Sequence, residues 1–364
     1  MNKLLLGTAA AALMIAPAAA GPIAVTVGGY YNTIAYSVDS DNVGKDYKDI
    51  SLQEDAEIIF KGKGKLNNGL TIGFQVQLEA HSTNNKVSTS TAVNAANEEV
   101  TVVTGVGNDD QIDEHYVYVK GDFGKIELGA ENSAAYKTQV TAPKFLGWKT
   151  YDNNFATWSK VAKYEKPLHD NYSGDANKIN YYSPRFNGVQ FVYSLTPSAA
   201  NSSGAGMDLL EEGEGYDDVT AMGVNYKGKI GGMKVKASFT TEEGEGTDGI
   251  DDTETAIGLS VSSGPWTIGG HIFEAEENNV DVWDITTLGV QYKLNEKTSI
   301  GVVMHDQTDD STASGNNDTT VMVLGGSTKL GAGTKLTYSY ETVESDDPAK
   351  GDSTFMGVGL LLKF

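Results

Sequence analysis

The chain has 364 residues, a formal net charge of −22, 42 glycines and no cysteine. Without cysteine, a disulfide framework and thiol-ligated metal sites are excluded. No window approaches the roughly 20 consecutive apolar residues of a membrane-spanning helix. A transmembrane β-barrel escapes that test, because only alternate residues of its strands face lipid.

Residues 1–20 predict a cleaved secretory signal peptide. Lys3 is followed by an apolar run, Leu4 to Ile15, and then by Pro17 and three alanines that end at Ala20. This order of a positive charge, a short apolar stretch and small residues is typical of an export signal, and the run is too short for a membrane anchor. We therefore expect an exported protein whose fold comprises residues 21–364.

Short runs of alternating apolar and polar residues recur through the rest of the chain and predict strands. There are sixteen: 24–38, 56–66, 70–81, 112–120, 125–131, 178–183, 189–196, 219–227, 233–241, 254–262, 266–274, 283–294, 298–306, 319–329, 335–342 and 354–364.

The connections between these runs alternate between tight turns and long loops. Seven are short and rich in Gly, Asn and Pro, as hairpin turns require. Eight are longer: 39–55, 82–111, 132–177, 197–218, 242–253, 275–282, 307–318 and 343–353. This regularity predicts an all-β protein, a 16-stranded antiparallel transmembrane β-barrel with short periplasmic turns and long extracellular loops. A secreted β-sandwich or β-propeller, the alternative, has no reason to alternate its turn lengths so regularly.

The last run predicts a strand that is sealed into the barrel. Met356, Val358, Leu360, Leu362 and Phe364 share one face of it. Chain ends usually fray, so an apolar face that closes on an aromatic residue indicates that Phe364 helps to close the barrel in the membrane.

Three stretches carry a resemblance to a known family: EHYVYVKGDFGKIELG at 114–129, NYYSPRFNG at 180–188, and Phe364. Through them the chain resembles the Gram-negative general porins, of the trimeric sixteen-stranded kind found in alphaproteobacteria. The resemblance implies a homotrimer in the bacterial outer membrane that lets small hydrophilic solutes and ions diffuse passively. It also implies contacts with outer-membrane lipid and lipopolysaccharide, insertion by the barrel-assembly machinery, and no nucleic-acid partner.

The resemblance further implies that the third long loop, 132–177, folds into the lumen and constricts it. This loop is the longest connection, and its aromatic content argues for order. Its predicted anchors are Phe145, Trp148, Tyr151, Phe155 and Trp158.

Charged residues of this loop and of one wall are the candidate constriction residues, because fixed charge at close quarters sets pore selectivity. On the wall, Ile58, Phe60 and Leu66 mark the lipid face and turn three lysines toward the lumen. General porins often oppose arginines to carboxylates here, but the only arginine is Arg185, in a short turn. The candidates are Lys61, Lys63, Lys65, Lys149, Asp152, Lys160, Lys163, Glu165, Asp170 and Asp175.

Two further loops predict an acidic vestibule and hence a weak cation preference. The candidate residues are Asp208, Glu211, Glu212, Glu242, Glu243, Asp251 and Asp252. No cofactor is expected beyond loosely bound divalent cations such as calcium. Asp39 and Asp41 superficially begin a calcium loop, but Ile50 stands where that motif needs a glutamate.

Two other functions remain as alternatives. A solute-specific channel would show an aromatic track along its pore, whereas the tyrosines outside the third loop are assigned to membrane-interface girdles: Tyr30, Tyr31, Tyr36, Tyr292, Tyr338 and Tyr340. An enzymatic barrel is not expected, because the five histidines lie on separate segments and no serine elbow or HExxH motif occurs. The sequence thus favours a general diffusion channel over both.

Overall fold

The computed structural model describes residues 23–41, 49–79, 86–93, 99–107, 112–146, 172–199, 215–246, 250–277, 280–310, 318–346 and 351–364. In these ranges one short helix, α2 (Ala134–Thr138), accompanies eighteen strands. No helix there is long and apolar enough to cross a membrane. The strands are β1 (Ala24–Ser40), β2 (Ser51–Lys65), β3 (Thr71–Glu79), β4 (Lys86–Val93), β5 (Glu99–Gly107), β6 (Ile112–Gly121), β7 (Gly124–Ala130), β8 (Asn177–Tyr182), β9 (Val189–Ser198), β10 (Asp217–Ile230), β11 (Met233–Glu245), β12 (Asp251–Ser263), β13 (Trp266–Glu277), β14 (Val280–Lys293), β15 (Thr298–Asp309), β16 (Thr319–Gly331), β17 (Thr334–Ser345) and β18 (Ser353–Lys363).

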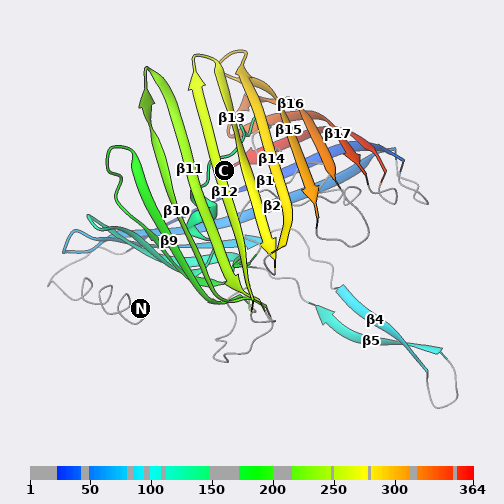
Figure 1. Ribbon diagram of the computed structural model, residues 1–364, viewed down its shortest axis with the longest axis horizontal. Helices are drawn as coiled ribbons and strands as arrows, with labels where there is room; N and C mark the ends of the chain where they lie inside the picture. Colours follow the sequence, from blue (N-terminus) through cyan, green and yellow to red (C-terminus); the bar gives the residue numbers. More distant parts are fainter. Residues whose placement is uncertain are drawn as a thin grey trace.

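Sixteen of these strands form one closed antiparallel barrel, which confirms the predicted fold. Neighbours in sequence pair in space except that β3 pairs with β6, and β1 pairs with β18 to close the ring. The other two strands, β4 and β5, form a separate hairpin that extends away from the barrel wall (Figure 1). The prediction of a long loop over 82–111 was therefore wrong in part, since Lys86–Val93 and Glu99–Gly107 pair as antiparallel strands.

The two ends of the barrel sheet meet at the last residue. The backbone N–H of Gly29 donates to the Phe364 carbonyl oxygen (3.0 Å), and the Phe364 N–H donates to the Gly29 carbonyl oxygen (3.2 Å). The Phe364 side chain is exposed on the outer surface. The seam is thus hydrogen-bonded as far as the final residue, as a wall without sheet edges requires.

Side chains alternate across the wall, so that apolar residues cover the outside and polar residues line the lumen. In β1, Tyr31 is exposed outside while Asn32 and Ile34 are buried inside. The same parity places Tyr30 and Tyr36 inside, so their assignment to an outer girdle was wrong. Near the chain ends, Gly28, Gly357 and Gly359 share the inward parity.

The largest apolar core lies inside the lumen, because the outer surface of the barrel faces lipid. Inward residues of β1 and of β15 to β18 pack there against residues of the third long loop. The cluster contains Ile34, Ala142, Phe145, Leu146, Val303, Val321, Val323, Val343 and Phe355. The barrel is therefore filled on one side by its own loop.

Several strands extend further than the alternation of the sequence indicated. The predicted loop 242–253 is wrong over most of its length, because β11 continues to Glu245 and β12 begins at Asp251. Glu242 pairs with Glu254 and Glu243 with Thr253 in a regular ladder. Strands can continue beyond the lipid with acidic side chains, since only the membrane-spanning part must be apolar outside.

Candidate functional site: the channel lumen

The third long loop enters the lumen through α2, which is fixed to the barrel wall. Its N-cap is Ser133, whose Oγ accepts a hydrogen bond from the Tyr136 N–H (3.1 Å). The Ala134 N–H donates to Ser194 Oγ of β9 at 2.7 Å. Ala134 and Ala135 are completely buried. The Ser133 cap and the two small buried residues of this helix thus hold the start of the loop directly against the strands.

A buried network of charges surrounds this entry. Glu127 of β7 accepts from Lys125 Nζ (2.6 Å), Lys137 Nζ (3.1 Å) and the Tyr182 hydroxyl (2.9 Å). Lys137 also lies 3.1 Å from Glu131. Burial raises the pKa of the Glu131 carboxyl, while Lys137 acts to lower it. Lys137 therefore pairs with the wall and is not a free pore charge.

Beyond α2, residues 139–146 run along the inner wall and are pinned at both ends. The Val140 N–H donates to Ser238 Oγ of β11 at 2.7 Å, and Ser327 Oγ of β16 donates to the Phe145 carbonyl at 2.7 Å. Phe145 is 1% exposed. Burying a side chain of this size contributes about 1.5–3 kcal/mol, so this predicted anchor residue does lie in an apolar seat.

Glycines on the wall make room for the loop. An added Cβ at Gly258 would overlap the Val140 carbonyl, and one at Gly289 would approach Pro143 Cδ to 3.0 Å. An added Cβ at Gly301 would overlap the Phe145 ring, and one at Gly325 would approach Leu146 Cδ2 to 2.9 Å. These four glycines lie on β12, β14, β15 and β16: Gly258, Gly289, Gly301 and Gly325. We call them the glycine track, a groove that lets the loop backbone lie close to the wall.

Charge is divided along the lumen between its loop end and its turn end. On β2, Asp55 and Glu57 precede Lys61, Lys63 and Lys65, which approach the short turn after Lys65. The same order, with carboxylates toward the long loops and lysines toward the short turns, recurs on β11 and β17. These residues are Lys234, Lys236 and Glu242 on β11, and Lys335 and Glu341 on β17.

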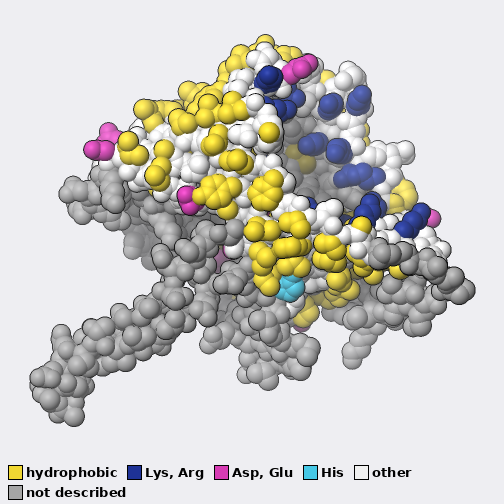
Figure 2. Space-filling view, turned by 180° about the vertical axis from the view of Figure 1, so that it is seen from behind, with side chains coloured by type: hydrophobic (Ala, Val, Ile, Leu, Met, Phe, Trp, Pro, Cys, Tyr) yellow, Lys and Arg dark blue, Asp and Glu magenta, His cyan; other side chains and the backbone are white. Residues whose placement is uncertain are grey.

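Further inward lysines gather at the turn end on other strands, and Figure 2 shows Lys and Arg side chains lining a hollow there. They are Lys120, Lys125, Lys227, Lys229, Lys293, Lys329 and Lys363. Arg185, the single arginine, lies at this end too, where it donates to Gln190 Oε1 (2.9 Å) and Asn225 Oδ1 (2.6 Å). The described lumen is thus acidic toward the loops and basic toward the turns.

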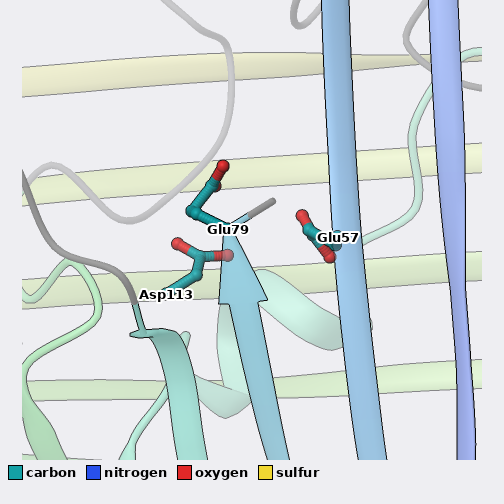
Figure 3. A group of neighbouring side chains, drawn as sticks. All are labelled: Glu57, Glu79 and Asp113. Carbon is teal, nitrogen blue, oxygen red and sulfur yellow. The ribbon is translucent and has the colours of Figure 1, made fainter. Parts of the chain in front are cut away.

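Three carboxylates converge at the loop end, on β2, β3 and β6 (Figure 3). Ligand oxygens of Glu57, Glu79 and Asp113 all lie within 4.8 Å of one another, and Glu57 accepts a hydrogen bond from the Tyr30 hydroxyl at 2.7 Å. Oxygen ligands at this spacing suit a divalent cation. The expected divalent sites were Asp39 and Asp41 instead, at the end of β1, and divalent binding stays a prediction. The sequence pattern does not indicate this trio, because only the pairing of β2, β3 and β6 brings the three carboxylates together.

Most predicted loop charges fall in 147–171, outside the described residues. The vestibule residues Asp208, Glu211 and Glu212 lie in 200–214, which is also outside the described residues. The expected constriction by Lys61, Lys63, Lys65 and the charges of this loop therefore stays a prediction. The residues outside the described ranges are Trp148, Lys149, Tyr151, Asp152, Phe155, Trp158, Lys160, Lys163, Glu165 and Asp170.

Four of the predicted acidic residues in the described part of the chain differ in their burial and in their hydrogen-bond partners. Asp175 is half-buried just before β8. Glu242, expected in an exposed vestibule, is completely buried and accepts from the Ser173 N–H at 3.0 Å. Asp252 is also buried and accepts from the Tyr216 hydroxyl at 2.8 Å, whereas Asp251 is exposed. Glu242 and Asp252 therefore hold loops to the wall, and their vestibule position was wrong.

Two histidines come together in a way that their sequence separation concealed. His271 of β13 and His305 of β15 both flank Thr287 of β14 in register, and Thr287 Oγ1 lies 3.1 Å from His305 Nδ1. Both imidazoles are buried. They belong to the packed inner wall.

Comparison with known proteins agrees with this architecture. A family model described as Gram-negative porin matches residues 7–348. The chain belongs to the Gram-negative porins. It is accordingly an outer-membrane protein with the barrel of a diffusion channel. No match is found among curated proteins.

Solved porins share the fold at low sequence identity. An anion-selective porin from Comamonas acidovorans is 14% identical with a TM-score of 0.61, covering 94% of this chain and 100% of that one. The trimer form of OmpT from Vibrio cholerae gives the same four values. OmpF of Salmonella typhi, in complex with daunomycin, is 14% identical with a TM-score of 0.61, over 93% of this chain and 97% of that one. At this identity the likeness concerns the fold alone.

Proposed function

We propose that this porin is a general diffusion channel for small hydrophilic solutes and ions, with a weak preference for cations. The observation that carries the proposal is the division of charge along the lumen. Fixed carboxylates toward the loop end act on every ion that enters from outside, over the roughly 8–10 Å of a Debye length at moderate salt. The lysines toward the turn end meet only ions that have passed that region.

A general pore also fits the way in which the third loop is held. Residues 139–146 are seated on one wall, along β11 to β16, and this seat leaves the charged wall of β2 and β3 on another side of the ring. Selection by fixed charge and by size at such a neck acts on small hydrophilic solutes of many kinds. We further propose a homotrimer, in line with the trimer form described for the similar OmpT.

Liposome swelling tests general diffusion against solute specificity. In liposomes that contain the purified protein, we expect the swelling rate to fall smoothly with solute size across unrelated neutral sugars and amino acids. The control is liposomes that contain the heat-denatured protein. Rapid swelling with one solute, and none with others of equal size, would contradict a general pore and support a solute-specific channel.

A further inference from the structure

A cavity of about 460 Å³ opens at the turn end of the lumen, below the third loop. Lys144 and Phe145 of the loop form one side of it. Inward residues and turn residues of β14 to β17 form the rest, including Gln291, Ser299 and Ser327. Small-molecule sites are usually concave spaces of about 300–1,000 Å³, so this cavity has the size of a binding site for a small solute.

Positive charge dominates the lining of this turn-end cavity. Five lysines face one acidic residue, which leaves five minus one, or four, net positive charges: Lys144, Lys293, Lys297, Lys329, Lys335 and Glu296. Lys329 and Lys335 are direct partners across the β16–β17 pair. Like charges at opposed positions destabilise a sheet pair unless something compensates them. Such a concentration of ammonium groups therefore indicates an anionic ligand.

The cavity lysines differ from the lysines at the loop entry in what surrounds them. Lys125 and Lys137 are within 3.1 Å of Glu127. Among the described residues, no carboxylate lies within ion-pair distance of Lys293, Lys329 or Lys335. These three ammonium groups are thus available to a ligand, while amide and hydroxyl groups of Gln291 and Ser299 offer further polar contacts.

We propose that the turn-end cavity binds small solutes that carry a phosphate or diphosphate group, held chiefly by Lys293, Lys329 and Lys335. Lysine binds phosphate as a compact point charge with several donor hydrogens. A polyvalent anion binds to four clustered positive charges more strongly than chloride does. The inference rests on the proposed function, because the solute must be able to diffuse into the lumen.

Calorimetric titration of the detergent-solubilised full-length protein with sodium pyrophosphate tests this site. We expect saturable binding by the unaltered protein. The triple variant K293Q/K329Q/K335Q should weaken binding at least about tenfold, because charge-assisted contacts to the anion are lost. The single variant K329Q, which removes one exposed lysine, should weaken it about threefold and serves if the triple variant does not fold.

The matched control removes the same charge from the same end of the lumen. K227Q/K229Q/K234Q alters inward lysines of β10 and β11 outside the cavity, and should change the pyrophosphate affinity less than about twofold. Equal weakening in both triple variants would overturn the site and leave only a diffuse basic field. Absence of saturable binding by the unaltered protein would also overturn it. KCl conductance of each protein in a planar bilayer keeps these failures distinct from a failure of the pore itself.

Discussion

Replacement of Glu57, Glu79 and Asp113 by their amides should lower the potassium-to-chloride permeability ratio about threefold. One unit charge acts on an ion at about 10 Å in water with roughly 0.4 kcal/mol, less after screening by salt. The three clustered carboxylates at the loop end together then contribute up to about 1 kcal/mol of preference for cations. Reversal potentials in a KCl gradient measure the ratio.

The control for that triple variant neutralises three acids that face away from the lumen. Glu274, Asp284 and Asp306 occupy exposed positions of β13, β14 and β15, on the opposite parity from the buried lumenal side chains of these strands. Amides there should leave the permeability ratio nearly unchanged. If both triple variants shift it equally, the selectivity arises from net charge and not from the lumenal trio.

Gly258→Ala should release the third loop from its seat. The added methyl group would overlap the Val140 carbonyl, and the backbone can escape only by moving off the wall. Overpacking costs about 1–3 kcal/mol, which raises the population of the released loop about fivefold or more. Limited trypsin digestion of the folded barrel measures release, because Lys137 and Lys144 lie in the segment that would become accessible.

Gly269→Ala is the matched substitution on the neighbouring strand β13. The nearest neighbours of its added methyl group would be strand atoms, 2.9 Å away at the Leu259 carbonyl and 3.0 Å away at Ser260 Cβ. The digestion rate should therefore stay close to that of the unaltered protein. Equal and slow digestion of both variants would show that Gly258 does not seat the loop.

The barrel was predictable from the sequence because each of its determinants is local. Strand alternation and turn residues act over a few positions, so all sixteen barrel strands were placed near their observed bounds. The β4–β5 hairpin carried the same signal, since Val100, Val102 and Val103 lie in a Thr-rich run. It was missed because the long connection around it was interpreted as a single loop.

The site was less predictable because it depends on register between strands distant in sequence. The parity of β2 did place Lys61, Lys63 and Lys65 on the inward face, but their position toward the turn end follows from the pairing with β3. Glycines such as Gly258 and Gly301 indicate only weak strand propensity in the sequence. Their alignment beneath one loop segment, like the convergence of Glu57 with Asp113, requires the closed barrel.

The zero-current potential of the purified protein in a planar bilayer under a KCl gradient tests the proposed cation preference most directly. We expect ohmic conductance steps and a potential whose sign shows that potassium crosses more readily than chloride. A potential of the opposite sign would contradict the proposal that the acidic loop end sets selectivity, and would assign it to the basic turn end. Folded protein that inserts without conducting would contradict the channel function itself.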